Sequence, residues 1–320
     1  MLRGRRVGKF IARRLGFMLL TLLAASLVIF FITQMLPGDV ATMIMGRFAT
    51  AEGLARLRAE LGLDRPIHIQ YLDWLRHFVT GDWGMSLSTS SPILPMVMER
   101  LRNSAMLAAV GMVMSVPLAI ALGVIAALKR DSWLDHLISV VSLALVGLPE
   151  FVTGLFLIGI FALTFHVLPA SSSIDPDASF FEALPRLILP GVTITLVMLA
   201  YVARMTRSST IEVLKTDYTR TAFLKGLPRR EVLLKHVLRN ALLPTVTILA
   251  ISIGWLIGGL IVTESVFGYP GIGRLLLYAI QRRDLPLIQA ITMLVVAIYG
   301  LSNLIADILY AYLNPRIRLS

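Results

Sequence analysis

The stretch DYTRTAFLKGLPRREVLLKHVLRNALLP, Asp217–Pro244, is a polar and basic interruption between two long apolar segments. Its six Lys and Arg residues oppose only Asp217 and Glu231. A loop of this composition must lie in water at one face of a bilayer, while the flanking apolar segments lie inside the bilayer. The stretch therefore predicts an integral membrane protein, and its excess of positive charge places the loop in the cytoplasm.

The residues of this loop predict two short helices that meet at a glycine. Thr219–Lys225 can form the first helix, Gly226 can end it in a left-handed conformation, and Pro228 suits the first turn of the second. In the second helix, the charged residues from Glu231 to Arg239 recur at i, i+4 and i+8, and the apolar residues lie off this face. We therefore expect an amphipathic elbow with one face that can dock on a partner.

The run RTAFLKGL, Arg220–Leu227, resembles the EAA loop of ABC importer permeases, in the RTAxxKGL form of the peptide-transporter branch. Arg220 stands where the general motif has Glu, and the closing Leu-Pro of the motif reads Leu238-Arg239; both departures are usual in the peptide branch. The resemblance implies that residues 208–241 form a cytoplasmic loop that couples to a separate ATPase subunit. It assigns this contact to Arg220, Thr221, Ala222, Lys225, Gly226, Leu227, Arg230 and Glu231. From the residues alone, the alternative is a basic loop that only fixes topology.

The composition of the whole chain agrees with a membrane location. Of its 320 residues, 57% are hydrophobic and 15% are charged, whereas in globular proteins about half are apolar and about a quarter charged. The net charge of +11 does not indicate nucleic acid, because the cations cluster beside apolar spans. The absence of cysteine excludes disulfides, thiolate metal sites and cysteine nucleophiles.

Six apolar stretches are predicted to span the membrane. They are Leu15–Met35, Leu101–Leu128, Leu134–Leu168, Leu187–Met205, Leu242–Val262 and Leu285–Ile308. The first resembles a signal peptide, but it is long enough to span and lacks a convincing cleavage site, so we expect an uncleaved helix. Pro117 predicts a kink in the second stretch. The third is too long for one straight span, and Gly147–Glu150 predicts a tilt or kink near its middle.

The distribution of charge predicts the topology. Nineteen of the 30 Lys and Arg residues fall in segments predicted to be cytoplasmic, and the short outside loops hold four. Both termini are therefore expected in the cytoplasm of a bacterial or archaeal cell, with the chain crossing its plasma (inner) membrane. The predicted organisation is a cytoplasmic N-terminus with the first helix (1–36), a long external segment (37–98) and a five-helix core (99–320).

The external segment contains two runs that look like the region after the first helix of dipeptide and oligopeptide permeases. They are LPGD, Leu36–Asp39, and LGLDRPIHIQYLDWLRHFVTGDWGMSL, Leu61–Leu87. Turns are expected at Pro37–Asp39 and Gly81–Gly84. Between them we expect a helix with four partly buried apolar residues: Ile69, Leu72, Trp74 and Phe78. This helix could be a cap on the membrane surface or a contact for a delivering protein.

The carboxyl-terminal part of the chain strongly resembles the end of peptide-branch permeases. The resemblance rests on ESVFGYPGIGRLLLYAIQRRD, Glu264–Asp284, the following span, and the tail LYAYLNPRIR, Leu309–Arg318. In the family this region borders the external gate, so it implies Glu264, Gly271 and Gly273 as candidate gate residues. A short helix is expected from Gly271, with Leu275, Leu276 and Ala279 on the membrane surface.

The sequence contains three further acidic features with a predicted location or role. An acidic outside loop is expected at Pro169–Pro185, and Asp307 is expected to pair with a nearby arginine. Glu150, at membrane depth beside Pro149, is a functional candidate by default. It could line the pathway and attract a substrate amine, or it could hydrogen-bond backbone groups that the proline leaves free.

No GxxxxGK[ST], HExxH or GxSxG motif occurs in the chain, so we expect neither an enzyme nor a nucleotide or metal site. The resemblance implies an all-α integral membrane protein with the fold of a type I ABC importer permease, which forms half of a pathway for dipeptides or oligopeptides. It implies as partners a second homologous permease, two ATPase subunits that bind ATP and Mg²⁺, an extracytoplasmic substrate-binding protein and membrane lipid. Relatives also carry nickel, glutathione or oligosaccharides. Alternatives from other classes are an ion-driven secondary transporter, which usually shows intramembrane acids and an internal repeat, and a membrane scaffold.

Overall fold

The computed structural model describes residues 2–35, 40–45, 50–60, 62–174 and 179–313. Within these ranges the chain is helical, and the β pairing is limited to an isolated bridge between Met85 and Pro92. The α-helices, and two π-helical segments labelled η, are α1 (Leu2–Met35), α2 (Val40–Met45), α3 (Ala51–Glu60), α4 (Ile67–Thr80), α5 (Ile93–Leu128), α6 (Trp133–Gly147), α7 (Glu150–Leu157), η2 (Ile158–Thr164), α8 (Phe180–Leu214), α9 (Asp217–Leu224), α10 (Arg229–Glu231), η3 (Val232–Val237), α11 (Leu238–Phe267), α12 (Ile272–Arg282) and α13 (Leu285–Leu313).

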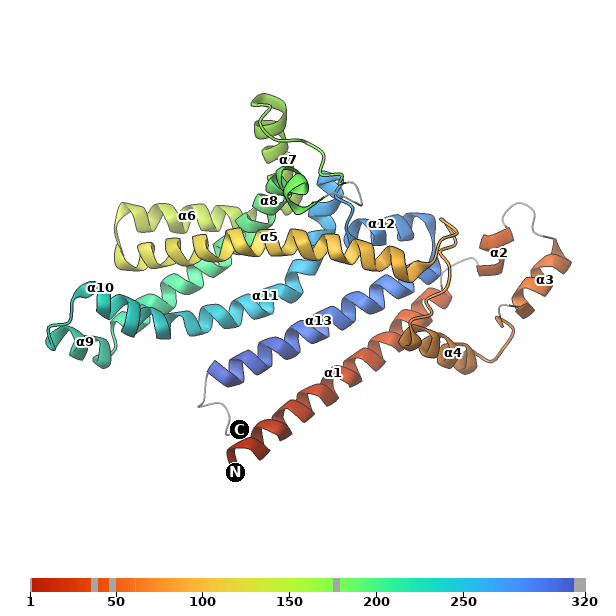
Figure 1. Ribbon diagram of the computed structural model, residues 1–320, viewed down its shortest axis with the longest axis horizontal. Helices are drawn as coiled ribbons and strands as arrows, with labels where there is room; N and C mark the ends of the chain where they lie inside the picture. Colours follow the sequence, from red (N-terminus) through yellow and green to blue (C-terminus); the bar gives the residue numbers. More distant parts are fainter. Residues whose placement is uncertain (1, 36–39, 46–49, 61, 175–178, 314–320) are drawn as a thin grey trace.

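Helix α8 lies at the centre of the molecule, where it packs against α5, α6 and α11. A Cβ atom on Gly123 of α5 would lie only 2.5 Å from the carbonyl oxygen of Ala203 in α8, so these two helices are in backbone contact. Figure 1 shows α1 and α13 lying side by side at the edge of this group. Near the amino end of α1 and the carboxyl end of α13, Arg14 and Asp307 form an ion pair of 2.7 Å, which confirms the pairing with an arginine expected for Asp307.

Several helices are long and apolar enough to cross a membrane. Five stretches of the described chain meet this condition, namely Phe10–Met35, Ile93–Leu128, Phe180–Leu214, Arg229–Leu249 and Leu285–Leu309. Two pairs of consecutive helices meet the condition only when each pair is taken together, and both pairs are sharply bent at a short break. If each pair counts as one span, the number rises to seven. The pairs are Trp133–Gly147 with Glu150–Thr164 and Gly258–Phe267 with Ile272–Arg282. The predicted multi-pass helical architecture is thus present, while the number of six spans stays a prediction.

The third predicted span is broken more sharply than a kink. Helices α6 and α7 meet at an angle of 107°. The residue before Pro149, Leu148, is extended, with φ −86° and ψ 128°, because a proline disfavours helical backbone at the preceding residue. Proline also has no N–H to continue the helical hydrogen bonds.

Two predicted boundaries also move. Helix α5 begins at Ile93 rather than Leu101, since Pro92 stands at its amino-terminal cap. Helix α8 begins at Phe180, inside the predicted acidic loop, because Ser179 and Glu182 form a capping box there. Pro185 accordingly lies within the helix, and the acids Asp175 and Asp177 lie outside the described residues.

Helix α12 differs from its prediction in what it packs against. Leu275 and Ala279 are buried, and Leu276 is partly buried, in a cluster with Ile93 of α5 and Leu287 of α13. The expected location of these side chains on the membrane surface is wrong, because the apolar face of α12 packs on protein. The helix does begin where predicted, with Gly271 as its amino-terminal cap.

Helix α4 matches its prediction in part. Trp74 and Phe78 are half-buried as expected, whereas Ile69 and Leu72 are 36% and 59% exposed. The turn predicted at Gly81–Gly84 is present, with both glycines at positive φ. The turn predicted at Pro37–Asp39 lies outside the described residues.

Candidate coupling loop and pathway residues

The predicted elbow is a distinct projection at one end of the molecule (Figure 1). The chain leaves α8, forms α9, turns at Gly226 and returns through α10 and η3 into α11. Gly226 has φ +76° and nothing within 4 Å of the place where a Cβ would stand. The left-handed turn predicted from the sequence is confirmed, and glycine serves it without steric cost.

The elbow has a small apolar core of its own. Ala222 of α9 packs with Val232 and Val237 of η3, and all three are buried. The hydroxyl of Thr219, also buried, donates to the carbonyl oxygen of Val213 at 2.9 Å and so fixes α9 to the end of α8. These contacts hold the two arms of the elbow in one arrangement.

The outer surface of the elbow is apolar at its tip and basic around it. Leu224 is 80% exposed, and Phe223 and Tyr218 beside it are also exposed. The surrounding cations are exposed as well: Arg220, Lys225, Arg229 and Arg230. An apolar patch with a charged rim is the usual anatomy of a protein-binding surface.

Seven of the eight residues predicted for coupling fall into two groups by exposure, and the eighth, Glu231, forms an ion pair. Arg220, Thr221, Lys225, Gly226 and Arg230 are exposed and available to a partner, whereas Ala222 is buried and Leu227 is half-buried, so these two support the elbow from inside. Glu231 pairs with Lys235 at 2.7 Å. Sequence reasoning missed Phe223 and Leu224, although two adjacent apolar residues in a short polar helix cannot both face the same small core.

A buried ion pair braces the helix that leads into the elbow. Asp135 of α6 is 2% exposed and accepts two hydrogen bonds from Arg207 of α8, from Nε at 2.5 Å and from Nη2 at 2.6 Å. Its Oδ2 also accepts from the backbone N–H of Asp131, which has φ +62°. Bidentate pairs of this kind fix orientation as well as distance. No local spacing in the sequence predicts this pair, because its two residues are 72 positions apart.

Glu150 stands at the bend between α6 and α7. Its Oε2 is buried and has no hydrogen-bond partner among the described residues. A Cβ on Gly259 of α11 would lie 2.8 Å from both carboxylate oxygens, so only glycine leaves room for them. One turn further along α11, the hydroxyl of Thr263 is likewise buried without a partner in the described chain. Within the described chain, Glu150 makes no hydrogen bond to the backbone groups that Pro149 leaves free. The alternative role of Glu150 as a partner for these groups therefore has no support in these contacts.

Glu264 is fully buried and is satisfied by hydrogen bonds. Its Oε1 accepts from the hydroxyl of Ser104 at 2.5 Å, and its Oε2 accepts from the backbone N–H groups of Gly273 at 2.8 Å and Arg274 at 3.1 Å. The carboxylate therefore covers the amino terminus of α12, where negative charge is favoured. A Cβ on Gly271 would overlap this carboxylate. The three predicted gate residues, Glu264, Gly271 and Gly273, thus lie together.

A second buried carboxylate, Asp284, holds the other end of α12. Its Oδ2 accepts from the hydroxyls of Ser86 at 2.6 Å and Ser88 at 2.8 Å and from the backbone N–H of Ser88 at 3.0 Å. Its Oδ1 accepts from the N–H of Leu287 at 3.3 Å in the first turn of α13. Helix α12 is therefore fixed to α5 at its start and to the Ser86–Ser88 loop at its end.

These features define a polytopic, all-helical membrane protein with a basic elbow at one end and a helix held by two buried carboxylates at the other. The chain belongs to the family of binding-protein-dependent transport system inner membrane components. The model of that family matches residues 119–319, and the model of the membrane component's N-terminal region matches residues 7–121. The chain is accordingly a multi-pass permease subunit of an ABC importer, and its role is that of a pathway subunit.

Curated relatives extend over almost the whole chain. The dipeptide transport system permease protein of Escherichia coli is 38% identical over 336 residues, covering 97% of this chain and 98% of the relative. A probable peptide ABC transporter permease protein of Sinorhizobium fredii is 36% identical over 312 residues, covering 98% of this chain and 100% of the relative. The glutathione transport system permease protein of Shigella flexneri is 37% identical over 309 residues, covering 97% and 98%.

Proposed function

We propose that this permease subunit imports short peptides in a complex driven by ATP hydrolysis on separate subunits. The names of its relatives support the substrate class, since two are described as peptide or dipeptide permeases and a third as a glutathione permease. Glutathione is itself a short peptide with a free amine and free carboxylates. Import of dipeptides, oligopeptides or glutathione would therefore present the pathway with the same charged end groups.

The observation that carries the proposal is the elbow. A loop that only fixed topology would need positive charge, but it would need neither a core of its own nor a preorganised left-handed turn. The buried contacts of Ala222, Val232 and Val237 keep the exposed tip at Leu224 in one position. A rigid apolar tip surrounded by cations suits a cleft with an acidic rim on a cytosolic partner.

The arrangement proposed for the complex follows from this contact. Two ATPase subunits bind ATP and Mg²⁺ and dock on the elbows of this chain and of a second, homologous permease, while a substrate-binding protein docks on the opposite face. Both termini of the chain then lie in the cytoplasm, and the chain itself binds no cofactor. The Asp135–Arg207 pair supports transmission of force, because it ties α6 to the helix that continues into the elbow.

Glu150 is proposed as the pathway residue that receives the amino group of a peptide. A buried carboxylate without a donor is costly in an apolar environment, so a cationic group is the natural complement. Gly259 leaves room for the Glu150 carboxylate in this position, and the unpartnered hydroxyl of Thr263 offers a further polar group on the same helix. Helix α12, with Glu264, Gly271 and Gly273 at its start, is proposed as part of the external gate.

Truncation of the elbow tip tests the docking role. Leu224→Ala removes an exposed side chain that contributes little to folding, and we expect about a tenfold loss of co-purified ATPase subunits, as for an interface hot spot. The matched control is Leu72→Ala, because Leu72 is a similarly exposed leucine in α4 at the other end of the molecule. Equal recovery of the ATPase with both variants would remove the support for docking at this tip.

A further inference from the structure

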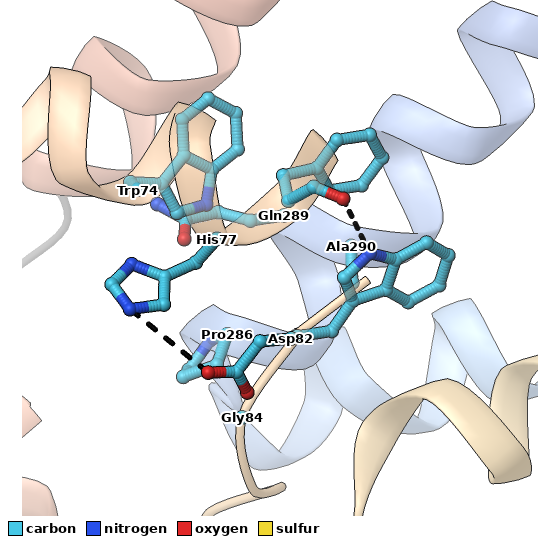
Figure 2. Close-up of a pocket in the computed structure, with 9 residues that line it drawn as sticks. Trp74, His77, Asp82, Gly84, Pro286, Gln289 and Ala290 are labelled. Carbon is cyan, nitrogen blue, oxygen red and sulfur yellow. Dashed lines mark hydrogen bonds and ion pairs between the residues drawn. The ribbon is translucent and has the colours of Figure 1, made fainter. Parts of the chain in front are cut away.

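A cavity of about 250 Å³ lies at the end of the molecule opposite the elbow, and no part of the proposed transport mechanism uses it. Helix α4, the turn from Gly81 to Gly84 and the start of α13 line it on one side, and it is open to solvent on the other (Figure 2). The lining residues are Trp74, His77, Phe78, Asp82, Trp83, Gly84, Pro286, Gln289 and Ala290. Below, this space is called the α4 pocket.

Aromatic rings form much of the wall of the α4 pocket and are held in fixed positions. Phe78 and Trp83 are stacked, with ring centroids 5.0 Å apart and planes at 4°. The indole N–H of Trp83 donates to the carbonyl oxygen of Phe78 at 2.9 Å. Trp74 lies beside Phe78 with centroids 6.1 Å apart, and it also contacts Phe30 of α1. Ordered aromatic faces of this kind attract cations through the ring quadrupole.

The polar groups of the α4 pocket call for a hydrogen-bond donor. Nδ1 of His77 lies 2.7 Å from the carbonyl oxygen of Asp73, which can only accept, so Nδ1 carries the proton. In the neutral ring, Nε2 is then an acceptor, and it faces Oδ2 of Asp82 at 3.9 Å. Two acceptors thus face each other across a gap that an N–H donor could fill, at about 2.8 Å from each.

The charged residues around the cavity favour a positively charged ligand. Asp82 is the carboxylate among the lining residues, and none of these nine residues is Lys or Arg. One of the two N–H groups of the Gln289 amide donates to the hydroxyl of Thr33 at 2.6 Å, which leaves one donor on this side chain. An anion would meet few donors here, whereas an ammonium group would meet aromatic faces, a carboxylate and an imidazole nitrogen.

The position of α4 indicates where such a group comes from. Tyr71 of α4 hydrogen-bonds Ser26 at 2.8 Å, and Tyr71 and Trp74 pack on Phe30, so α4 lies against the last turns of the apolar helix α1. Tyrosine and tryptophan gather at the level of lipid headgroups. Leu72 and Val79, exposed on α4, are suited to the same boundary.

We propose that the α4 pocket binds an alkylammonium group, and that its occupant is the ethanolamine headgroup of a membrane phospholipid. The ammonium donates to Oδ2 of Asp82 and to Nε2 of His77, and its methylene groups lie against Trp74. The bound lipid would fill the space between α4 and α13 and so secure α4 to the end of the helix pair α1 and α13. The site is independent of the elbow and of Glu150.

The test uses the full-length chain in nanodiscs that contain equal amounts of phosphatidylethanolamine and phosphatidylglycerol. Lipids retained after extraction are measured by mass spectrometry for the unmodified chain, Asp82→Asn, Trp74→Leu and the control Asp64→Asn, an exposed aspartate outside the pocket. We expect about a two- to fivefold preference for phosphatidylethanolamine, because the side chains of His77 and Asp82 are 58% and 70% exposed and an exposed ion pair is weak. The preference should vanish in the two pocket variants and persist in the control.

A second arm separates a lipid from a soluble source. Soluble ethanolamine is titrated into nanodiscs made without phosphatidylethanolamine, and the total tryptophan fluorescence, to which Trp74 and Trp83 contribute, is followed. One outcome is a saturable change of fluorescence that Asp82→Asn abolishes, together with no lipid preference in the first arm. This outcome would support an ammonium site but assign it to a soluble amine instead of a lipid. Lipid preference that survives both pocket variants, or no response in either arm, would overturn the proposal.

Discussion

Replacing Gly226 with valine tests the elbow by changing one backbone preference and no charge. Gly226 has φ +76° and open space around it, so the new side chain meets no neighbour and the cost is confined to the backbone. A left-handed conformation costs an L-residue about 1–2 kcal/mol, and a β-branched side chain lies at the upper end of that range. The small core around Ala222 and the hydrogen bond from Thr219 to Val213 oppose rearrangement. A cost of this size lowers the population of the elbow about 5- to 30-fold.

The expected result is normal membrane insertion with impaired coupling. Three quantities are measured in one preparation: the amount of full-length chain in the membrane, the amount of co-purified ATPase, and substrate-stimulated ATP hydrolysis. Gly226→Val should leave the amount of chain in the membrane unchanged. It should reduce either the co-purified ATPase or the substrate-stimulated hydrolysis at least about fivefold. Gly226→Asn should behave almost like the unmodified protein, because asparagine tolerates the left-handed region.

A control at the other end separates coupling from general instability. Gly84 has φ +72° and also has nothing within 4 Å of its Cβ position, so Gly84→Val imposes the same strain far from the elbow. It should not change association with the ATPase. The coupling role is refuted if Gly226→Val matches the unmodified protein in all three measurements, or if Gly84→Val lowers association to the same extent.

Three further predictions concern topology, the pathway and α12. A reporter active only in the cytoplasm should work when fused after Lys129 and fail after Asp73, as the charge distribution requires; activity at Asp73 would overturn the orientation. Glu150→Gln should raise KM for import of peptides with a free amino terminus by about tenfold or more and leave N-acetylated peptides unaffected; equal effects on both, measured by uptake, would place the carboxylate outside the pathway. Gly271→Ala should lower the free energy of unfolding by about 2–4 kcal/mol, because the new Cβ overlaps a buried carboxylate and displaces its hydrogen bonds. The control is Gly159→Ala, because nothing lies within 4 Å of the Cβ position at Gly159. Both variants are unfolded thermally, and equal melting temperatures of the two would contradict the prediction.

Features that depend on neighbouring residues could be predicted from the sequence. The turn at Gly226, the start of α10 after Pro228 and the break before Glu150 each follow from backbone preferences of glycine or proline. The family resemblance found in RTAFLKGL agreed with the family matches along the chain. The angle of 107° between α6 and α7 did not follow, because a proline breaks a helix without fixing the direction of the next one.

Contacts between distant residues could not be predicted. Ser104 and Glu264 are 160 positions apart, and Asp135 and Arg207 are 72 apart, so no local spacing connects them. Helix α12 shows a related limit. Its amphipathic pattern identifies an apolar face, but lipid and protein are both apolar surroundings, and the pattern does not tell one from the other.

The pairing of α1 with α13 has a consequence for how the protein is made. Met18 approaches Gly300, and Thr33 receives a hydrogen bond from Gln289, so α1 has its main partner in a helix that is synthesised much later. Helix α1 must therefore wait in the bilayer without this partner until α13 has been synthesised. Truncated chains would expose the unpaired face of α1, and membrane quality-control proteases would have a simple feature by which to recognise unfinished molecules.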